Sequence, residues 1–391
     1  MIAQKRQLYL AAFLMEIAYG LFLLIASLMA VKVIGSPFIL GLTGTLHVVT
    51  RVLGNVVFGR LSDRIGRRIL LLFACFLSLV SFVLLGFQSV LFIWLAYFIS
   101  GVGNSIFWPL IESWIGHGAD NKNLLRSLGL FGLAFTGGVT IGNLAGGFFM
   151  KIAPLVSIIF GCILLIAVSF LLFRTQDHPS SDAAVGSPKV ESTLNSENNK
   201  LSRDVKDQFL WIGWIANFAT WTTIGIIRFL FTKLCVNLDI PKEIIGSINA
   251  VLYSCWFVMF IAMMHFRGWI YKLRPLIMFQ WIGIGALLMM WLWASKMTFF
   301  IAFGLFGVSA GMTYLSSMFY GQDGAHDKGN KSGLHEMVLG IGMIVGPFFG
   351  GVVAQLFSLQ TPFLFCAIVV MMAMITEVVL YKRAIRFADA P

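Results

Sequence analysis

Twelve long apolar runs constrain the fold of this 391-residue chain more than any other feature. Each run is about as long as an α-helix must be to cross the hydrocarbon core of a bilayer. Six of the runs precede a long polar stretch and six follow it. The expected spans are 8–30, 38–58, 69–87, 90–114, 124–150, 155–173, 208–234, 244–266, 274–294, 298–320, 332–357 and 362–381.

The composition agrees with membrane spans, because 59% of the residues are hydrophobic and only 12% are charged. In hydrocarbon every backbone group must be hydrogen-bonded, which leaves helices and closed barrels. The apolar runs lack the alternation of polar and apolar residues that barrel strands show. The sequence therefore predicts an all-α integral membrane protein with twelve transmembrane helices, arranged as two pseudo-symmetric six-helix bundles.

The polar stretch divides the chain. Residues 175–207 are rich in Ser, Asn, Lys and Asp and contain hardly an aromatic, which is typical of a flexible linker. We expect an N-terminal bundle over 1–174, a cytoplasmic linker over 175–207 and a C-terminal bundle over 208–391.

Basic residues predict the orientation, because Lys and Arg accumulate in loops that stay in the cytoplasm. Most of the 28 basic residues lie at the two ends and in the even-numbered loops. The odd-numbered loops hold only Lys32, Lys151, Lys233, Lys242 and Lys296. Both termini are therefore expected in the cytoplasm, and short loops favour a bacterial inner membrane. The positive charge is a topology signal, and nucleic-acid binding is not expected.

A basic segment at 59–68 joins the second and third spans. Its glycines predict a tight turn, and its aspartate and arginines can bind helix ends or each other. We interpret it as a gate that stabilises one conformation, with a simple topology-setting loop as the alternative. The residues of this gate motif are Gly59, Asp63, Arg64, Gly66, Arg67 and Arg68.

Glycines recur at a displacement of 204 residues, which indicates that the two halves are an internal repeat. The plain interpretation is close helix packing, and the alternative is a helix that bends when the halves rock. The motif comprises Gly138, Gly142, Asn143, Gly146 and Gly147 in the fifth span, and Gly342, Gly346, Pro347, Gly350 and Gly351 in the eleventh.

Over its whole length the sequence resembles the major facilitator superfamily (MFS). The gate motif is similar to that family's loop between helices 2 and 3, and the glycines are similar to the helix 5 motif of its drug:proton antiporters. Asn143 stands where those antiporters carry a proline, and Tyr97 where they carry an arginine in helix 4. The resemblance implies alternating access between two rocking halves, and export.

Ionisable and polar residues inside the spans are the candidates for a solute or proton site, since such groups are costly in hydrocarbon. We expect Glu16 to exchange a proton, and His47 with Arg51 to hold an anionic partner such as Glu16 or a substrate group. Structural ion pairs are the alternative. Glu377 is close enough to a span end to reach water. The full set is Glu16, His47, Arg51, Trp108, Glu112, Asn217, Trp221, Arg228, Tyr314, His335 and Glu336.

These features predict a secondary transporter that exports a small amphipathic or lipophilic solute by proton antiport. The alternatives are transport of an anionic organic solute held by Arg51 and Arg228, or a receptor or scaffold that does not transport. The sequence has no phosphate-binding loop and no metal-ligand spacing, and its five cysteines are scattered. We therefore expect no enzyme activity, cofactor or metal. The expected partners are a small solute, protons and the lipid bilayer, and the protein is expected to be a monomer.

Overall fold

A computed structural model describes residues 2–116, 124–175, 203–323 and 328–388. These residues form helices, loops and no strand. Twelve of the helices are long and apolar enough to cross a membrane, so the predicted all-α fold with twelve spans is confirmed. The helices are α1 Ile2–Val33, α2 Pro37–Ile65, α3 Arg67–Leu85, α4 Val90–Gly116, α5 Leu124–Ile152, α6 Pro154–Phe173, α7 Arg203–Phe229, the short α8 Phe231–Asn237, α9 Lys242–His265, α10 Leu273–Leu292, α11 Lys296–Gln322, α12 Lys328–Leu356 and α13 Thr361–Ala388.

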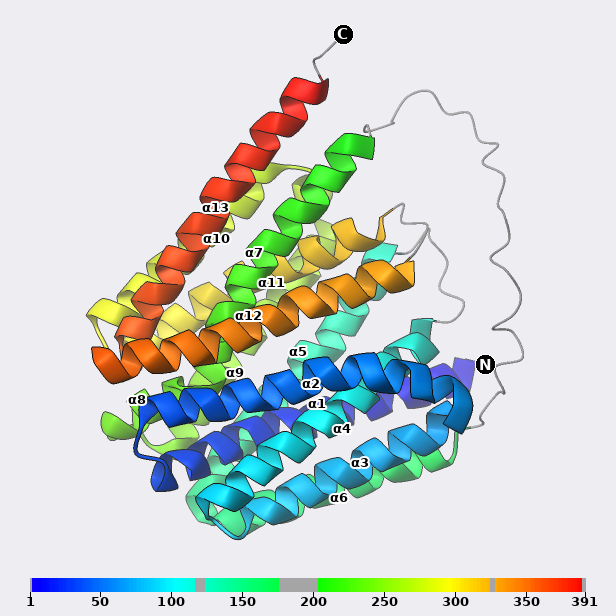
Figure 1. Cartoon of the computed structure of the whole chain (residues 1–391), viewed down its shortest axis with the longest axis vertical. Coiled ribbons are helices and arrows are strands. Elements are labelled where there is room, and N and C mark those ends of the chain that lie inside the picture. The colour runs from blue at the N-terminus through cyan, green and yellow to red at the C-terminus, as the bar shows by residue number, and fades with distance from the viewer. Residues whose placement is uncertain (1, 117–123, 176–202, 324–327, 389–391) are drawn as a thin grey trace.

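The helices gather into two groups (Figure 1). Helices α1–α6, in blue to teal, lie together in the lower part of the view, and α7–α13, in green to red, lie above them. Helices from the two groups pack directly against one another, α5 against α9 and α2 against α12. Because the number of spans is even, α1 begins and α13 ends on the same side of the membrane. We call this side the terminal face and the other side the far face.

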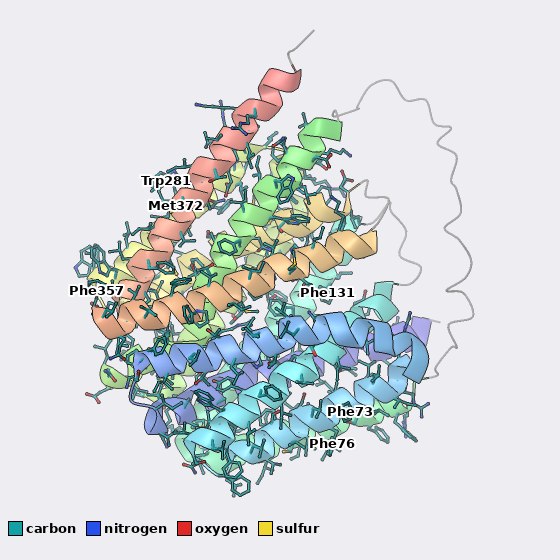
Figure 2. The ribbon with its side chains drawn as sticks, in the orientation of Figure 1. Phe73, Phe76, Phe131, Trp281, Phe357 and Met372 are labelled. Carbon is teal, nitrogen blue, oxygen red and sulfur yellow. The ribbon has the colours of Figure 1, made fainter. Side chains whose placement is uncertain are left out.

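The outside of the protein is apolar (Figure 2). Phe73, Phe76, Trp281, Phe357 and Met372 are all exposed. A surface of this kind suits lipid and not water, because contiguous large apolar side chains are uncommon on soluble monomers. The protein is therefore a multi-pass membrane protein that sits in a lipid bilayer.

The glycine motif packs in the same way in both halves. In the first half, a Cβ on Gly138 of α5 would lie 2.5 Å from the Cβ of Glu16 in α1. In the second, a Cβ on Gly342 of α12 would lie 2.7 Å from a backbone oxygen of α7. In the same way, a Cβ on Gly142 would meet backbone atoms of α1, and a Cβ on Gly346 would meet backbone atoms of α7. The repeat that appears in the sequence is thus also a repeat of helix contacts.

Two further glycine contacts join the halves near the far face. A Cβ on Gly147 of α5 would lie 3.0 Å from the Cα of Gly246 in α9. On the other side of the bundle, a Cβ on Gly41 of α2 would meet the carbonyl oxygen of Pro347 and lie 3.0 Å from the Cα of Gly351 in α12. Backbone therefore lies against backbone at both places, which leaves no room for side chains between the halves.

The gate motif adopts a different shape from the one that its sequence predicts. Helix α2 continues through Gly59 to Ile65, so the expected turn at Gly59 is wrong. The chain turns only at Gly66, whose φ of 93° suits glycine. The last residues of α2, which include charged side chains, continue the helix beyond the apolar part of the span. Arg68 Nη1 donates to the carbonyl oxygen of Thr175 at 3.5 Å, just beyond the end of α6. The side chains of Asp63 and Arg64 lie outside the described residues.

Two other regions differ from the predictions. Helix α7 begins at Arg203, inside the expected linker, and ends at Phe229, where a break at Leu230 separates it from α8. Glu377 does not reach water, because its side chain is fully buried and accepts hydrogen bonds from Gln280 Nε2 at 2.9 and 3.0 Å. A neighbouring amide satisfies this carboxyl group inside the second bundle.

Candidate functional site

A narrow central cavity lies between the two groups of helices, with about 410 Å³ of empty space that includes the part open to the outside. Its walls come from both groups. The residues that line it are Glu16, Tyr19, Arg51, Trp108, Phe131, Phe135, Trp221, Arg228, Tyr314, Glu336 and Leu339. The sequence analysis singles out seven of them, namely Glu16, Arg51, Trp108, Trp221, Arg228, Tyr314 and Glu336. The structure thus brings most of the candidate residues to one place.

The sequence analysis misses four residues of this lining. Tyr19 and Leu339 each lie three residues after a predicted carboxylate, Glu16 and Glu336, and therefore on the same helical face. That spacing could have identified them. Phe131 and Phe135 lie one turn apart on α5, but the chain contains 37 phenylalanines, so spacing alone does not distinguish this pair.

Glu16 lies in the middle of α1 and is 3% exposed. Its Oε2 atom has no hydrogen-bond partner among the residues that the structure describes. A buried carboxylate oxygen without a donor is costly when it is charged. The group therefore gains most from a proton, or from a positively charged group that enters the cavity.

Arg51 of α2 pairs with Glu336 of α12, with 3.4 Å between Nη2 and Oε2. The two side chains are 15% and 26% exposed, and the pair joins the first group of helices to the second. Such a pair is screened less than one on an open surface. It also satisfies both charges, so neither residue needs a solute to balance it.

His47 and Arg51 share no partner in the described part of the chain, and a joint contact with a substrate group stays a prediction. Its Nδ1 lies 2.9 Å from the backbone oxygen of Tyr97, and its Nε2 lies 3.1 Å from the hydroxyl of Tyr19. A carbonyl oxygen only accepts, so Nδ1 carries the proton and Nε2 accepts from Tyr19. The ring is buried against α1 and α4, where it orients the Tyr19 side chain beside the cavity.

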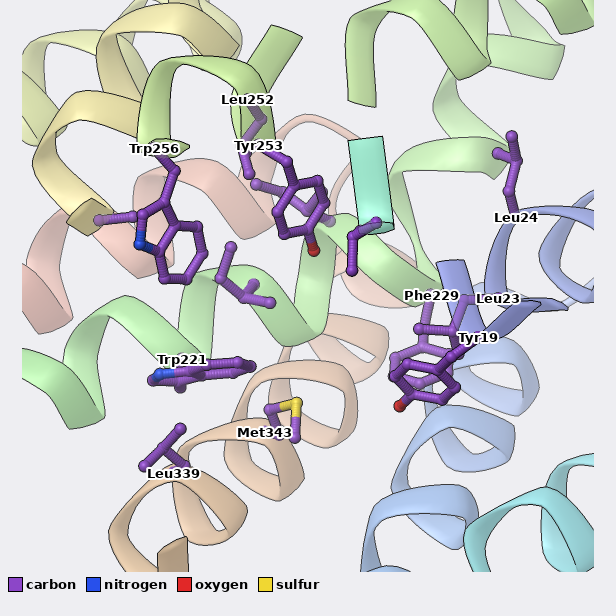
Figure 3. Close-up of a cluster of buried hydrophobic side chains, with 14 of the residues drawn as sticks. Tyr19, Leu23, Leu24, Trp221, Phe229, Leu252, Tyr253, Trp256, Leu339 and Met343 are labelled. Atoms are coloured by element: carbon purple, nitrogen blue, oxygen red, sulfur yellow. The ribbon is translucent and has the colours of Figure 1, made fainter. Parts of the chain in front are cut away.

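Arg228 of α7 lies among three aromatic rings, and Figure 3 labels the residues that carry them, Tyr19, Trp221 and Tyr253. Its guanidinium carbon lies 5.4 Å from the ring centre of Trp221, 5.8 Å from that of Tyr19 and 6.0 Å from that of Tyr253. Nε donates to the Tyr253 hydroxyl at 3.1 Å, and Nη1 lies 3.7 Å from the sulfur of Met343. Nη2 has no partner in the described part of the chain. One edge of the guanidinium group therefore stays available.

Arg228 also separates the central cavity from a second one, which we call the far-side cavity. This space has about 310 Å³ of empty volume, which includes the part open to the outside, and it lies closer to the far face. Its polar lining includes Asn143 and Asn249, whose amide nitrogens donate to carbonyl oxygens of their own helices. Arg228 lines both cavities and therefore lies at the boundary between them.

The remaining candidates either lie around the central cavity or have side chains outside the described residues. Asn217 Nδ2 donates to His335 Nε2 at 3.1 Å, and the His335 ring packs against Tyr314. Trp108 Nε1 donates to Asn104 Oδ1 at 3.1 Å. The side chain of Glu112 lies outside the described residues. Within the described ranges, no three His, Cys, Asp or Glu side chains come together closely enough to hold a metal ion.

The family model described as Major Facilitator Superfamily matches residues 8–334. The chain belongs to the Major Facilitator Superfamily. It is accordingly an MFS transporter, with a small-molecule substrate and a lipid bilayer around it. The resemblance that the gate motif and the glycine repeat indicate is confirmed.

Relatives of this MFS chain include a resistance protein. Over 162 residues the chain is 27% identical to the tetracycline resistance protein, class H, of Pasteurella multocida. The matching region is 40% of this chain and 40% of that protein. The match thus spans less than half the length of this curated relative.

Solved structures of other transporters share the fold over nearly the whole chain. The nucleoside transporter NupG has a TM-score of 0.69 at 13% identity, and covers 97% of this chain and 99% of its own. The human organic anion transporter MFSD10 (TETRAN) has a TM-score of 0.61 at 14% identity, with 95% and 99% covered. At these identities the likeness concerns the fold alone.

Proposed function

We propose that this MFS transporter exports a small amphipathic or lipophilic solute in exchange for protons. Glu16 carries the proposal. Its carboxyl group is buried at the middle of a span, faces the central cavity and has an oxygen without a partner in the described part of the chain. Intramembrane carboxylates of this kind mark proton pathways, because a proton removes the cost of burying the charge.

The walls of the cavity support an amphipathic or lipophilic solute. Six of the lining residues carry aromatic rings: Tyr19, Trp108, Phe131, Phe135, Trp221 and Tyr314. Large rings with a few polar groups between them suit a solute that is mostly apolar. Export is consistent with the name of the relative, a tetracycline resistance protein, and with the antiporter-like glycine motif.

We further propose that residues 1–174 and 208–391 rock as two units about the central cavity, joined by residues 175–207. The far-face contacts at Gly41 and Gly147 close one side in the conformation described here, and they must separate when the solute leaves. In this proposal the terminal face is cytoplasmic, the membrane is the bacterial inner membrane, and the protein works as a monomer. The gate motif stabilises one of the conformations.

In this proposal the proton on Glu16 and the solute compete for the central cavity. When the cavity is open to the cytoplasm, a solute enters and the Glu16 proton leaves. When it is open to the far face, where protons are more abundant, Glu16 is protonated again and the solute is released. Gly138 has no side chain, so α5 lies directly against Glu16. Coupling arises because the cavity cannot hold both the proton and the solute at the same time.

One observation favours a second candidate function, the uptake or facilitated transport of an anionic organic solute. The Nη2 atom of Arg228 has no partner among the described residues and faces the cavity. For this function Arg228, and not Glu16, would be the residue that transport depends on.

The two functions separate in liposomes that enclose a pH-sensitive dye. Under an imposed proton gradient, we expect lipophilic cations or neutral amphiphiles to drive proton movement in the wild type and not in Glu16→Gln. Glu377→Gln is the matched control, since Glu377 is equally buried but lies outside the central cavity. Movement of organic anions that is lost in Arg228→Met and kept in Glu16→Gln would support the second function instead.

A further inference from the structure

Two glutamates and two arginines line the central cavity. Arg51 and Glu336 satisfy each other across the two groups of helices. Glu16 and Arg228 each keep an atom without a partner, Oε2 and Nη2, within the part of the chain that the structure describes. The cavity therefore presents one acidic and one basic group to whatever enters it.

These two groups form no direct ion pair with each other in the described part of the chain. The ion pairs within 4.0 Å among the described residues include none between Glu16 and Arg228. Glu16 belongs to α1 and Arg228 to α7, so the two charges face the cavity from opposite halves of the molecule. Each charge is buried, at 3% and 8% exposure, and an unpaired buried charge is destabilising.

The surroundings of Arg228 define the group that it can bind. Its Nε atom is used by Tyr253 and its Nη1 atom by Met343, and three aromatic rings surround the guanidinium. Nη2 has no partner in the described ranges and Nη1 contacts only a sulfur atom, so this edge of the guanidinium group can donate to an oxygen of an acidic group. The Trp221 Nε1 donor, which also has no partner in the described ranges, lines the same cavity. A carboxylate or phenolate oxygen is suited to this edge.

We propose that the preferred solute is amphoteric and aromatic, with a basic amine that binds Glu16 and an acidic group that binds Arg228. This inference rests on the proposed function in that it takes the central cavity as the solute site. A purely basic solute leaves Arg228 unpaired, and a purely acidic one leaves Glu16 unpaired. An amphoteric solute satisfies both and stacks its rings on the aromatic wall between them. Because it binds one residue from each half, it also draws the two halves together.

Three naphthalene compounds with the same ring test this proposal. They are 6-(aminomethyl)-2-naphthoic acid, its methyl ester, which keeps only the amine, and its N-acetyl derivative, which keeps only the acid. Binding to the purified full-length protein in detergent is followed by quenching of tryptophan fluorescence. We expect the amino acid to bind at least tenfold more tightly than either derivative.

Two variants assign the contacts. Arg228→Met should lower the affinity for the amino acid to that for the ester and leave the ester unchanged. Glu16→Gln should lower it to that for the N-acetyl derivative and leave that derivative unchanged. Equal affinities of the three compounds for the wild type, or no binding of the amino acid, would overturn the proposal even if a variant failed to fold. An equal loss for all three compounds in Arg228→Met would also overturn it, because it would indicate a structural role.

Failure of this proposal is distinguishable from failure of proton antiport. Binding in detergent involves no gradient, so a preference for the amino acid can hold even if protons are not transported. Conversely, if the ester drives proton movement in liposomes as well as the amino acid does, antiport stands and the amphoteric preference is refuted.

Discussion

Adding one methyl group at Gly41 should open the far face of the protein. Gly41 lies where α2 meets α12, and a Cβ there would meet the carbonyl oxygen of Pro347 and lie 3.0 Å from the Cα of Gly351. Carbon atoms in ordinary contact are about 3.5–4.0 Å apart. Gly41→Ala therefore requires the two helices to separate by at least roughly 0.5–1 Å at the Cα of Gly351, and by more at the closer carbonyl oxygen of Pro347. Backbone atoms, unlike a flexible side chain, cannot rotate out of the way.

The size of the effect follows from the cost of overpacking. Forcing an additional methyl group into a well-packed contact costs about 1–3 kcal/mol. The strain acts only in the conformation in which the far face is closed, so it changes the ratio of closed to open molecules by roughly 5–150-fold. A far-face-open population of about 1% would rise to between about 5% and 60%.

Distances between spin labels at the far face measure this population. Gln88, in the loop between α3 and α4, and Ser295, in the loop between α10 and α11, are both exposed and lie in different halves. In a variant without the five native cysteines, cysteines introduced at these two positions carry the spin labels. The distance between the labels is then measured by pulsed electron paramagnetic resonance in lipid nanodiscs. In Gly41→Ala we expect a longer-distance population that is minor in the parent protein.

Gly285→Ala is the matched control. Gly285 is a helical glycine of α10 with no heavy atom within 4 Å of an added Cβ, so this variant should leave the distance distribution unchanged. If Gly41→Ala gives the same distances as the parent protein, the contact between α2 and α12 does not limit far-face opening, and the reasoning is refuted.

Three other predictions concern stability. Glu377→Leu leaves the amide of Gln280 buried without its partner, and should lower the free energy of unfolding by about 1–3 kcal/mol. Adding Gln280→Leu to this variant should restore much of the lost stability, as measured by a thermal melt. Arg51→Gln and Glu336→Gln should each lower the melting temperature, and the double variant should lose less than the sum, whereas additive losses would show that the pair is not coupled. Burial, followed by a hydrogen bond to a carboxylate, raises the pKa of the Tyr271 hydroxyl. Its contribution to stability is thus complete below the ordinary pKa of about 10 and is lost as the pH rises above it; Tyr271→Phe should make the melting temperature less sensitive to pH above 10, and unchanged sensitivity would contradict this.

Hydropathy predicts the fold of this chain well because the bilayer imposes strict requirements. An apolar run of sufficient length has to be a helix, so all twelve spans are predicted correctly. Outside the hydrocarbon that requirement disappears. This explains why the sequence analysis does not predict that α2 extends through Gly59 to Ile65 or that α7 begins at Arg203. In water a charged helix and a polar loop differ little in hydropathy, and the sequence alone does not distinguish them.

The candidate site is partly predictable for the same reason. Charges such as Glu16, Arg51 and Arg228 must face the interior of the bundle, and all three line the central cavity. Their pairing is not predictable, because the partner of Arg51 is Glu336, 285 residues away and in the other half. Partner choice depends on how the helices pack in three dimensions. Glu377 illustrates the same point, since a single amide on α10 decides that it stays buried.

The exchange of a proton for a solute at Glu16 is the central claim, and proton release on binding tests it most directly. Purified protein in weakly buffered detergent solution is mixed with a solute that it transports, and a pH-sensitive dye reports the protons released. The account predicts release by the wild type and by Glu377→Gln, and none by Glu16→Gln. Equal release from Glu16→Gln, or binding without release in the wild type, would contradict it.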